Sequence, residues 1–326
     1  MLRMCLDCMK AYIINDQMES LLVINNRNRI AWVDVAKGIG IILVMLGHMV
    51  DGHGLIGQWI WSFHMPLFFF LSGLFFMPFS DVKSVWKKSR QLLLPCIIFT
   101  IVICLVEYDV VGNKSTFIDL KKGLPHTMWF LTTLFLAMAW SSLMMRFFNP
   151  LGGLGISLFF AFMCKYTAMP NSYSLTSTFI ASVFLIAGYN RRYIMVGVEK
   201  LVFLVILQPS LVWLMNIHTS LNINRISIVG IVTAFLGIII VISVSKLIVD
   251  YKQYKHQSFI FDAMIYLGRN TLVLMSVHML FLSLYIHFLS IPNVLIDKLV
   301  QVVFVFAMSI LFSVLLKKPM AIIQGR

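Results

Sequence analysis

The sequence predicts an all-α, polytopic membrane protein with about ten transmembrane helices, and its composition and length lead to this fold class. Of its 326 residues, 60% are hydrophobic and only 12% are charged, which is about half the charged fraction of a typical soluble domain. Such a chain has too few charged side chains to cover a water-facing surface, and its 27 Phe and 21 Met need lipid or a protein interior. Because one span takes about 20 apolar residues, we expect no separate soluble domain.

The predicted helices follow one another as apolar runs joined by short polar segments. Residues 1–28 are polar and lack the features of a signal peptide, so we predict a cytoplasmic tail there. A transmembrane domain is predicted over 29–316 and a second cytoplasmic tail over 317–326. A basic loop is predicted at 80–91, between the second and third helices. The predicted helices fall near residues 30–50, 59–79, 92–108, 127–146, 151–168, 174–190, 199–216, 227–249, 269–290 and 296–316.

The basic residues predict which way the helices run. A net charge of +13 would suit a nucleic-acid partner in a soluble protein, but we expect none because no soluble basic domain is predicted. With the N-terminus in the cytoplasm, 18 of the 26 lysines and arginines fall in inner segments and 6 in outer segments. Cytoplasmic loops carry such an excess of Lys and Arg. We therefore predict a multi-pass protein of the plasma (inner) membrane with both termini in the cytoplasm.

The five cysteines predict no metal site. Cys5 and Cys8 form a single CxxC pair without a second pair, which is too little for a zinc site. Cys96, Cys104 and Cys164 lie in apolar runs, where cysteine behaves as a small hydrophobic residue.

The first predicted helix carries a stripe of ionisable residues. At about 100° per residue, Lys37 and His48 differ by only about 20° around the helix axis, and His48 lies about 16 Å further along it. Asp34 falls within about 40° of His48, and Asp51 within about 60°. Ionisable groups inside a span are costly and are candidates for function. We favour a functional site because the groups share one face.

A structural interpretation of the stripe stays open beside the functional one. In it, Asp34 forms an ion pair with Lys37 or Arg29 near the membrane interface, and a neighbour satisfies His48. For the functional interpretation, an imidazole within a membrane is suited to proton transfer because its unperturbed pKa lies near ~6.5.

These residues resemble the acyltransferase-3 family of membrane acyltransferases, in particular the group described as fucose 4-O-acetylase-like. The family's Arg/Lys-x10-His pattern is present as Lys37 and His48. The second helix continues the resemblance with Phe63-His64-Met65-Pro66 and Leu71-Ser72-Gly73, and the basic segment adds Lys87-x2-Arg90 before Pro95. Weaker similarity surrounds His126-Thr-Met-Trp129 and Gly268-Arg269-Asn270-Thr271, the latter followed by His278.

The resemblance implies transfer of an acyl group, usually acetyl, from cytoplasmic acyl-CoA to a sugar hydroxyl. The acceptors implied are a surface glycan or its lipid-linked precursor. Acetyl-CoA would be a donor substrate, with no permanently bound cofactor and no metal. Membrane lipid surrounds the protein, and homo-oligomers are left open.

Hydroxyl acylation needs a general base and stabilisation of the oxyanion. We predict His48 as the base, with Lys37 and Asp34 completing the catalytic group. The residues predicted to bind the CoA phosphates are Lys87, Lys88, Arg90 and Arg269. The residues predicted at the acceptor site are His64, Ser72 and Trp129.

Two other functions stay open. A proton-coupled transporter or exporter of a small or lipid-linked sugar would also use ionisable groups inside the membrane, although carriers often show interrupted helices in both halves. A non-catalytic assembly subunit would tolerate substitution of Lys37 and His48.

Overall fold

The computed structural model describes residues 30–50, 54–110, 128–166, 173–190, 198–216, 227–254 and 259–316. Within these ranges all regular secondary structure is helical, which confirms the predicted fold class. The two predicted tails lie outside the described residues. The helices are α2 (Ala31–Met49), α3 (Leu55–Gly73), α4 (Val82–Asp109), α6 (Trp129–Phe147), α7 (Pro150–Tyr166), α8 (Tyr173–Tyr189), α9 (Val198–Leu214), α10 (Ile228–Tyr254), α11 (Phe259–Arg269), α12 (Thr271–Phe288) and α13 (Val294–Leu315).

Six helices in the described part of the chain are long and apolar enough to cross a membrane: α2, α4, α6, α10, α12 and α13. Helices α7, α8 and α9 are apolar but shorter. These helices support an integral membrane protein. The number of about ten spans and the cytoplasmic location of both termini stay predictions.

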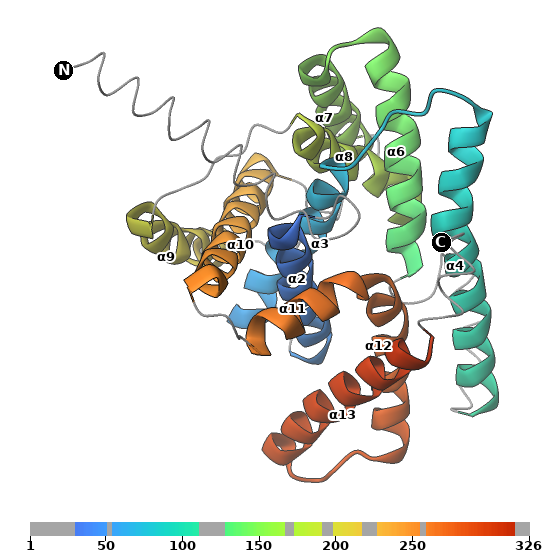
Figure 1. Ribbon diagram of the computed structural model, residues 1–326, viewed down its shortest axis with the longest axis vertical. Helices are drawn as coiled ribbons and strands as arrows, with labels where there is room; N and C mark the ends of the chain where they lie inside the picture. The colour runs from blue at the N-terminus through green and yellow to red at the C-terminus, as the bar shows by residue number, and fades with distance from the viewer. Residues whose placement is uncertain are drawn as a thin grey trace.

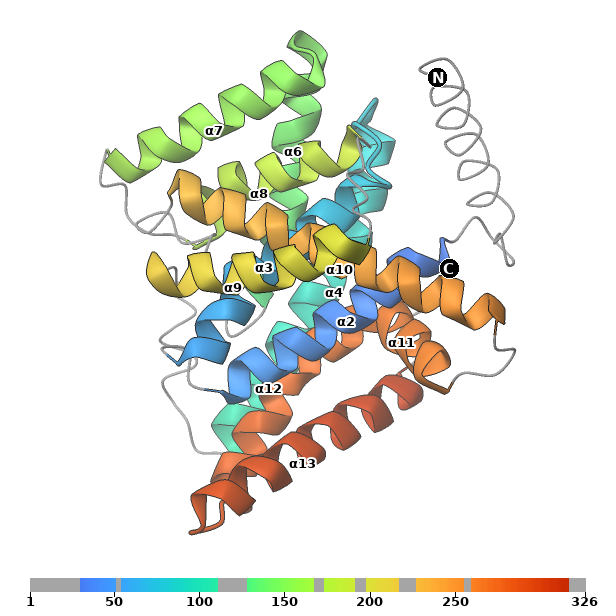
Figure 2. The same cartoon turned by 90° about the vertical axis from the view of Figure 1, so that its left-hand side faces the viewer.

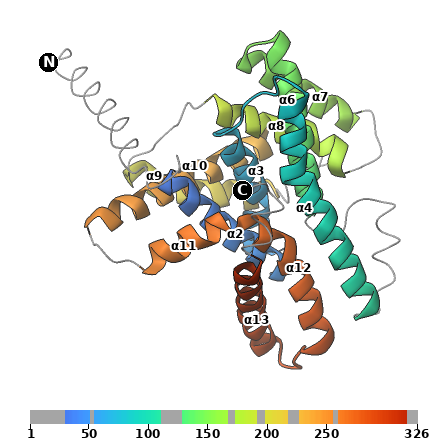
Figure 3. The same cartoon turned by 45° about the vertical axis from the view of Figure 1, so that its right-hand side comes forward.

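Helix α2 lies at the centre of the bundle. It packs against α3, α10, α11, α12 and α13 (Figure 1). In the most apolar stretch of α2, 67% is buried inside the protein, whereas in the most apolar stretch of α13 the buried share is only 22%. Figure 2 shows α7 and α13 at opposite ends of the bundle, and Figure 3 shows α4 along one flank beside α6. Among the described helices, the one with the polar stripe therefore has the most helical neighbours.

The basic loop predicted at 80–91 was wrong, because residues 82–91 form the first turns of α4. Asp81 caps the helix, since its side chain accepts a hydrogen bond from the Ser84 backbone N–H at 2.8 Å. The Asp81 N–H donates in turn to the Ser84 hydroxyl at 3.3 Å. This capping box satisfies backbone groups that the first turn of a helix leaves unpaired. The helix therefore begins ten residues before its apolar run.

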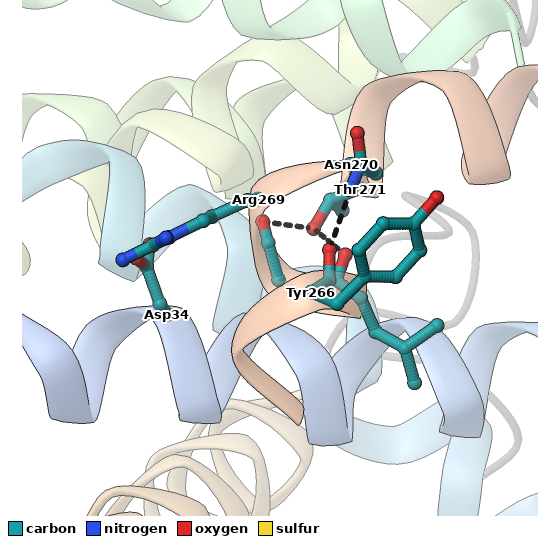
Figure 4. Close-up of polar contacts among 7 residues, drawn as sticks. Asp34, Tyr266, Arg269, Asn270 and Thr271 are labelled. Carbon is teal, nitrogen blue, oxygen red and sulfur yellow. Dashed lines mark hydrogen bonds and ion pairs between the residues drawn. The ribbon is translucent and has the colours of Figure 1, made fainter. Parts of the chain in front are cut away.

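The apolar run predicted as one helix at 269–290 is preceded by a separate short helix, α11, and begins as α12 at Thr271. Side-chain hydrogen bonds surround the break at Asn270, whose own backbone dihedrals are not helical. The Asn270 side-chain amide donates to the Tyr266 carbonyl at 2.8 Å, and the Thr271 hydroxyl donates to the Gly268 carbonyl at 2.7 Å (Figure 4). The Asn270 backbone N–H also donates to the Tyr266 carbonyl at 3.1 Å, so these side chains add to the backbone hydrogen bonds at the junction.

Helices α2 and α11 cross with their backbones in contact. A Cβ atom added at Gly38 would overlap the backbone of Met264, and one added at Gly268 would overlap the backbone of Asp34. Small residues allow helices in a membrane to approach this closely. The contact brings the α11–α12 junction against the first half of α2.

Candidate active site

Three histidines from three helices meet near the end of α2. The ring centroids of His48 and His278 lie 5.4 Å apart, with a 42° angle between the rings. The Trp61 ring packs edge-on against His48 at 5.4 Å and against His64 at 5.9 Å. We call His48, His64 and His278 the histidine group. It is formed by α2, α3 and α12, and His278 is far in sequence from the other two.

The backbone determines which ring nitrogen is basic in two of these histidines. His64 Nδ1 lies 2.8 Å from the Ile60 carbonyl oxygen, and His278 Nδ1 lies 3.0 Å from the Leu274 carbonyl oxygen. A carbonyl oxygen only accepts hydrogen bonds, so Nδ1 carries the proton in both rings. In the neutral rings, Nε2 is therefore the nitrogen with the lone pair. His64 and His278 are both buried, whereas His48 is partly exposed.

Close helix contact and two hydrogen bonds hold the end of α2 in place. Trp61 Nε1 donates to the Gly47 carbonyl at 2.9 Å. A Cβ atom at Gly47 would lie 3.0 Å from Ile60 Cγ2, so α2 and α3 are in close contact here and the Ile60 side chain would have to shift. Lys298 Nζ donates to the Met49 carbonyl at 3.2 Å, where a cation is favoured by the dipole of the helix C-terminus.

A cavity of about 220 Å³ lies among α2, α3, α4, α6, α11 and α12. Three predicted site residues line it, namely Lys37, Ser72 and Arg269. The other lining residues are Phe68, Leu92, Met128, Phe130, Leu131, Leu134, Gly268, Thr271, Leu272, Met275 and Ser276. The wall is therefore mostly apolar, with two cationic side chains.

The lining faces of three helices lead from the cavity to the histidine group. On α2, His48 follows Lys37 on nearly the same face, about 16 Å along the axis. On α3, His64 lies about one turn before Phe68. On α12, His278 lies about 20° around the axis from Thr271 and about 4.5 Å beyond Met275. The cationic residues and the histidines thus lie at opposite ends of one set of helix faces.

Asp34 pairs with a residue that we did not predict as its partner. We expected an ion pair with Lys37 or Arg29; Arg29 lies outside the described residues. In the structure, Arg269 Nε donates to Asp34 Oδ2 at 3.1 Å, and Figure 4 shows the Arg269 side chain extending from the α11–α12 junction to α2. The Arg269 side chain is 47% exposed and that of Asp34 only 12%. The two terminal nitrogens of Arg269 are further hydrogen-bond donors beside the Nε that binds Asp34.

The predicted catalytic group is divided between two places. Lys37 lines the cavity, with its Nζ 5.7 Å from the centroid of the Phe75 ring, while His48 belongs to the histidine group about 16 Å along α2. Lys37 and Asp34 are thus too far along the helix to contact a group that reacts at His48.

The predicted phosphate-binding residues of α4 differ in the direction they face. Lys88 lies four residues before the cavity-lining Leu92, about 40° from it around the axis, whereas Lys87 and Arg90 lie about 140° and 160° away. Lys87 and Arg90 are exposed, and Lys88 is partly buried. The helix geometry therefore favours Lys88 alone among these three as a neighbour of the cavity.

The predicted acceptor residues are also separated. Ser72 lines the cavity, and His64 belongs to the histidine group. Trp129 begins α6 between two lining residues, Met128 and Phe130, but does not line the cavity itself. The Met128 carbonyl accepts a hydrogen bond from Cys96 Sγ at 3.6 Å, in the middle of α4. The start of α6 therefore lies inside the bundle.

Two residues at the histidine group had no functional role predicted from the sequence. His278 was noted for a weak family similarity and for sharing a helix face with Thr271, and Trp61 was given no role. The available signal was the spacing of Thr271 and His278, which puts them on one face of a helix. Nothing local in the sequence predicts that this face meets His48.

Comparison with known proteins agrees with the resemblance. A family model described as an acyltransferase domain matches residues 30–318. The chain is also similar to the nodulation protein NolL of Mesorhizobium japonicum, at 30% identity over 128 residues that cover 34% of each chain. The chain thus aligns with about a third of this relative's length. No solved structure matches the chain. Because the family model covers nearly the whole sequence, the chain belongs to the acyltransferase-3 family.

Proposed function

We propose that the protein is a membrane O-acyltransferase that moves an acyl group, most simply acetyl, from acyl-CoA to a sugar hydroxyl. The sugar belongs to a surface glycan or to its lipid-linked precursor. The observation that carries the proposal is a cavity lined by Lys37 and Arg269 on helices whose lining faces lead on to the three histidines. This arrangement suits a donor with a highly charged head and a narrow arm that ends in the reactive thioester.

The charged part of acyl-CoA would bind at Lys37 and Arg269. Both residues line the cavity, and Arg269 has donors beyond the Nε that binds Asp34. Arginine and lysine both bind phosphate, and arginine does so with a planar fork of donors. The pantetheine arm would then lie along the apolar wall at Phe68 and Met275, with its thioester near the histidine group.

The chemistry follows from His48 as general base. His48 takes the proton of the acceptor hydroxyl while the oxygen attacks the thioester carbonyl carbon. A new C–O bond forms, the C–S bond breaks, and the proton passes from the imidazolium to the departing sulfur. The products are the O-acyl sugar and CoA with a free thiol. Proton count and charge are balanced without any further reactant.

The orientation of this reaction follows from the charge distribution. Because acyl-CoA is cytoplasmic, the end of the cavity at Lys37 and Arg269 would face the cytoplasm of a cell with this protein in its plasma (inner) membrane. The N-terminus would be on the same side, in agreement with the excess of Lys and Arg in the inner segments. The histidine group would then lie toward the outer half of the membrane, where a surface glycan is within reach.

The direct test is mass spectrometry of surface glycan and lipid-linked precursors from cells with and without the protein. We expect an acetyl-sized mass difference that disappears in the His48→Asn variant and persists in His287→Asn, which changes an exposed histidine on α12. Purified protein in vesicles should also release free CoA thiol when given acetyl-CoA and the acceptor. An unchanged glycan profile together with sugar flux into the same vesicles would instead identify a transporter.

Replacing Lys37 or Arg269 by Gln is expected to raise the KM for acyl-CoA by about 10–100-fold, because each loses a charge-assisted bond worth ~1.5–3 kcal/mol. The turnover number should change much less, since neither residue reaches His48. Steady-state kinetics with varied acyl-CoA measures both. Asp34→Asn is the matched control, because it removes the ion pair and keeps Arg269. A fall in kcat at unchanged KM would contradict the assignment.

On α4, we expect Lys88→Gln to raise the KM for acyl-CoA more than Lys87→Gln does. The two lysines are adjacent and carry the same charge, but only Lys88 lies on the face of Leu92. The same kinetic assay compares them. Equal effects would mean that α4 attracts the donor only through its overall charge.

A further inference from the structure

We propose that His278 is a positioning residue for His48: its Nε2 accepts a hydrogen bond from His48 and stabilises the His48 imidazolium during transfer. This inference rests on the proposed function and assigns a role to a residue outside the predicted catalytic group. It follows from the hydrogen bond of His278 to its own helix, from the distance between the two rings and from the burial of His278.

The direction of the hydrogen bond is forced. His278 Nδ1 donates to the Leu274 carbonyl at 3.0 Å, so Nε2 of the neutral ring can only accept. His48 must therefore be the donor in any hydrogen bond between the two rings. The His48 nitrogen that faces away from His278 then carries the lone pair and can act as base. His278 thus selects the tautomer of His48.

The distance between the rings agrees with this role. Their centroids are 5.4 Å apart, which is close to the sum of two ring radii and an N–H···N hydrogen bond of about 3 Å. The torsion that turns an imidazole about its own axis is broad, so a small rotation of His48 aligns the nitrogens. Catalytic hydrogen bonds are often long before substrate binds and shorten in the complex.

The surroundings of His278 strengthen the interaction. His278 is fully buried at 0% exposure, and a hydrogen bond is electrostatically stronger in such a medium than in water. Trp61 does not compete for His278, because its indole N–H donates to the Gly47 carbonyl at 2.9 Å. When His48 takes a proton, its bond to His278 becomes charge-assisted, and such bonds are roughly twice as strong as neutral ones.

The test compares His278→Leu, which removes the acceptor at similar volume, with His278→Gln, whose carbonyl oxygen can replace Nε2 as acceptor. We expect His278→Leu to lower kcat by about 10–100-fold, the range for a lost hydrogen bond to a charged group. His278→Gln should recover most of this loss. The KM for acyl-CoA should stay within about twofold in both variants, because neither substitution changes the interactions that bind acyl-CoA equally in the ground state and the transition state. His287→Leu on the same helix is the control and should match the wild type.

A double variant separates positioning from simple packing. If His278 acts through His48, then His48→Asn with His278→Leu should be no slower than His48→Asn alone, because residues that act as a unit are not additive. Thermal unfolding in detergent and acyl-CoA binding establish that each variant is folded. The proposal is overturned by a wild-type kcat in His278→Leu, by multiplied losses in the double variant, or by equal losses in the Gln and Leu variants. Failure of the proposed function looks different, since the wild type itself would then transfer no acyl group.

Discussion

Replacing His48 by Asn is expected to lower the rate of acyl transfer by about 10²–10⁴-fold, the range for loss of a general base. Asparagine is close to histidine in size and polarity but cannot take up a proton at neutral pH. The packing of the imidazole between Trp61 and His278 is the contact most affected. The KM for acyl-CoA should change little, because Lys37 and Arg269 line the cavity and Lys37 lies about 16 Å from His48 along α2.

The measurement is kcat and KM with acetyl-CoA and purified acceptor in vesicles. Lys37→Gln is the complementary variant on the same helix face, and it should show the opposite pattern of a raised KM with kcat largely kept. This contrast separates the two ends of the site. An acetyl transfer rate that survives His48→Asn would exclude His48 as the base, and His64 would become the next histidine to test.

The Gly268→Ala substitution is expected to destabilise the protein strongly although it adds a single methyl group. The new Cβ would overlap the Asp34 backbone, and a backbone cannot move aside as the end of a flexible side chain can. Overpacking in a well-packed core costs about 1–3 kcal/mol and occasionally more. Separation of α11 from α2 would also pull Arg269 away from Asp34, whose ion pair spans the same crossing.

Thermal unfolding in detergent measures the loss of stability, and the KM for acyl-CoA measures the displacement of Arg269. Gly155→Ala is the matched control, because nothing lies within 4 Å of a Cβ atom at Gly155 on α7. At that position alanine should be neutral or slightly stabilising, since alanine has a higher helix propensity than glycine. Equal unfolding temperatures for the two variants would show that the close crossing of α2 and α11 does not limit stability.

Much of the fold and of the first helix could be predicted from the sequence, because the signals are local. The share of apolar residues identified a membrane protein, and a helical period of 3.6 residues put Lys37 and His48 on one face. The start of α4 was missed although its signal was also local. The capping box of Asp81 and Ser84 starts the helix within a polar segment, ahead of the apolar run that marks the predicted span.

The partners of these residues could not be predicted, because they depend on how helices cross. Asp34 pairs with Arg269, 235 positions away in the chain, and His48 meets His278 across α12. Asp34 lies at the close approach of α2 and α11, and Arg269 and His278 stand on the two sides of the break at Asn270. Glycines in the sequence mark positions where a helix can approach closely, but they do not say which helix will do so.

The sequence by itself therefore determined the class of the protein, the face of α2 that carries the ionisable residues and the family resemblance. Backbone hydrogen bonds within each helix determine its period, so the spacing of residues along the chain is enough to group them on a face. Only the tertiary structure decided that the cations line a cavity, that the histidines of three helices meet beyond it, and that Lys87 and Arg90 face away from it. Those relations depend on shape complementarity between segments far apart in the chain, which no local pattern of residues records.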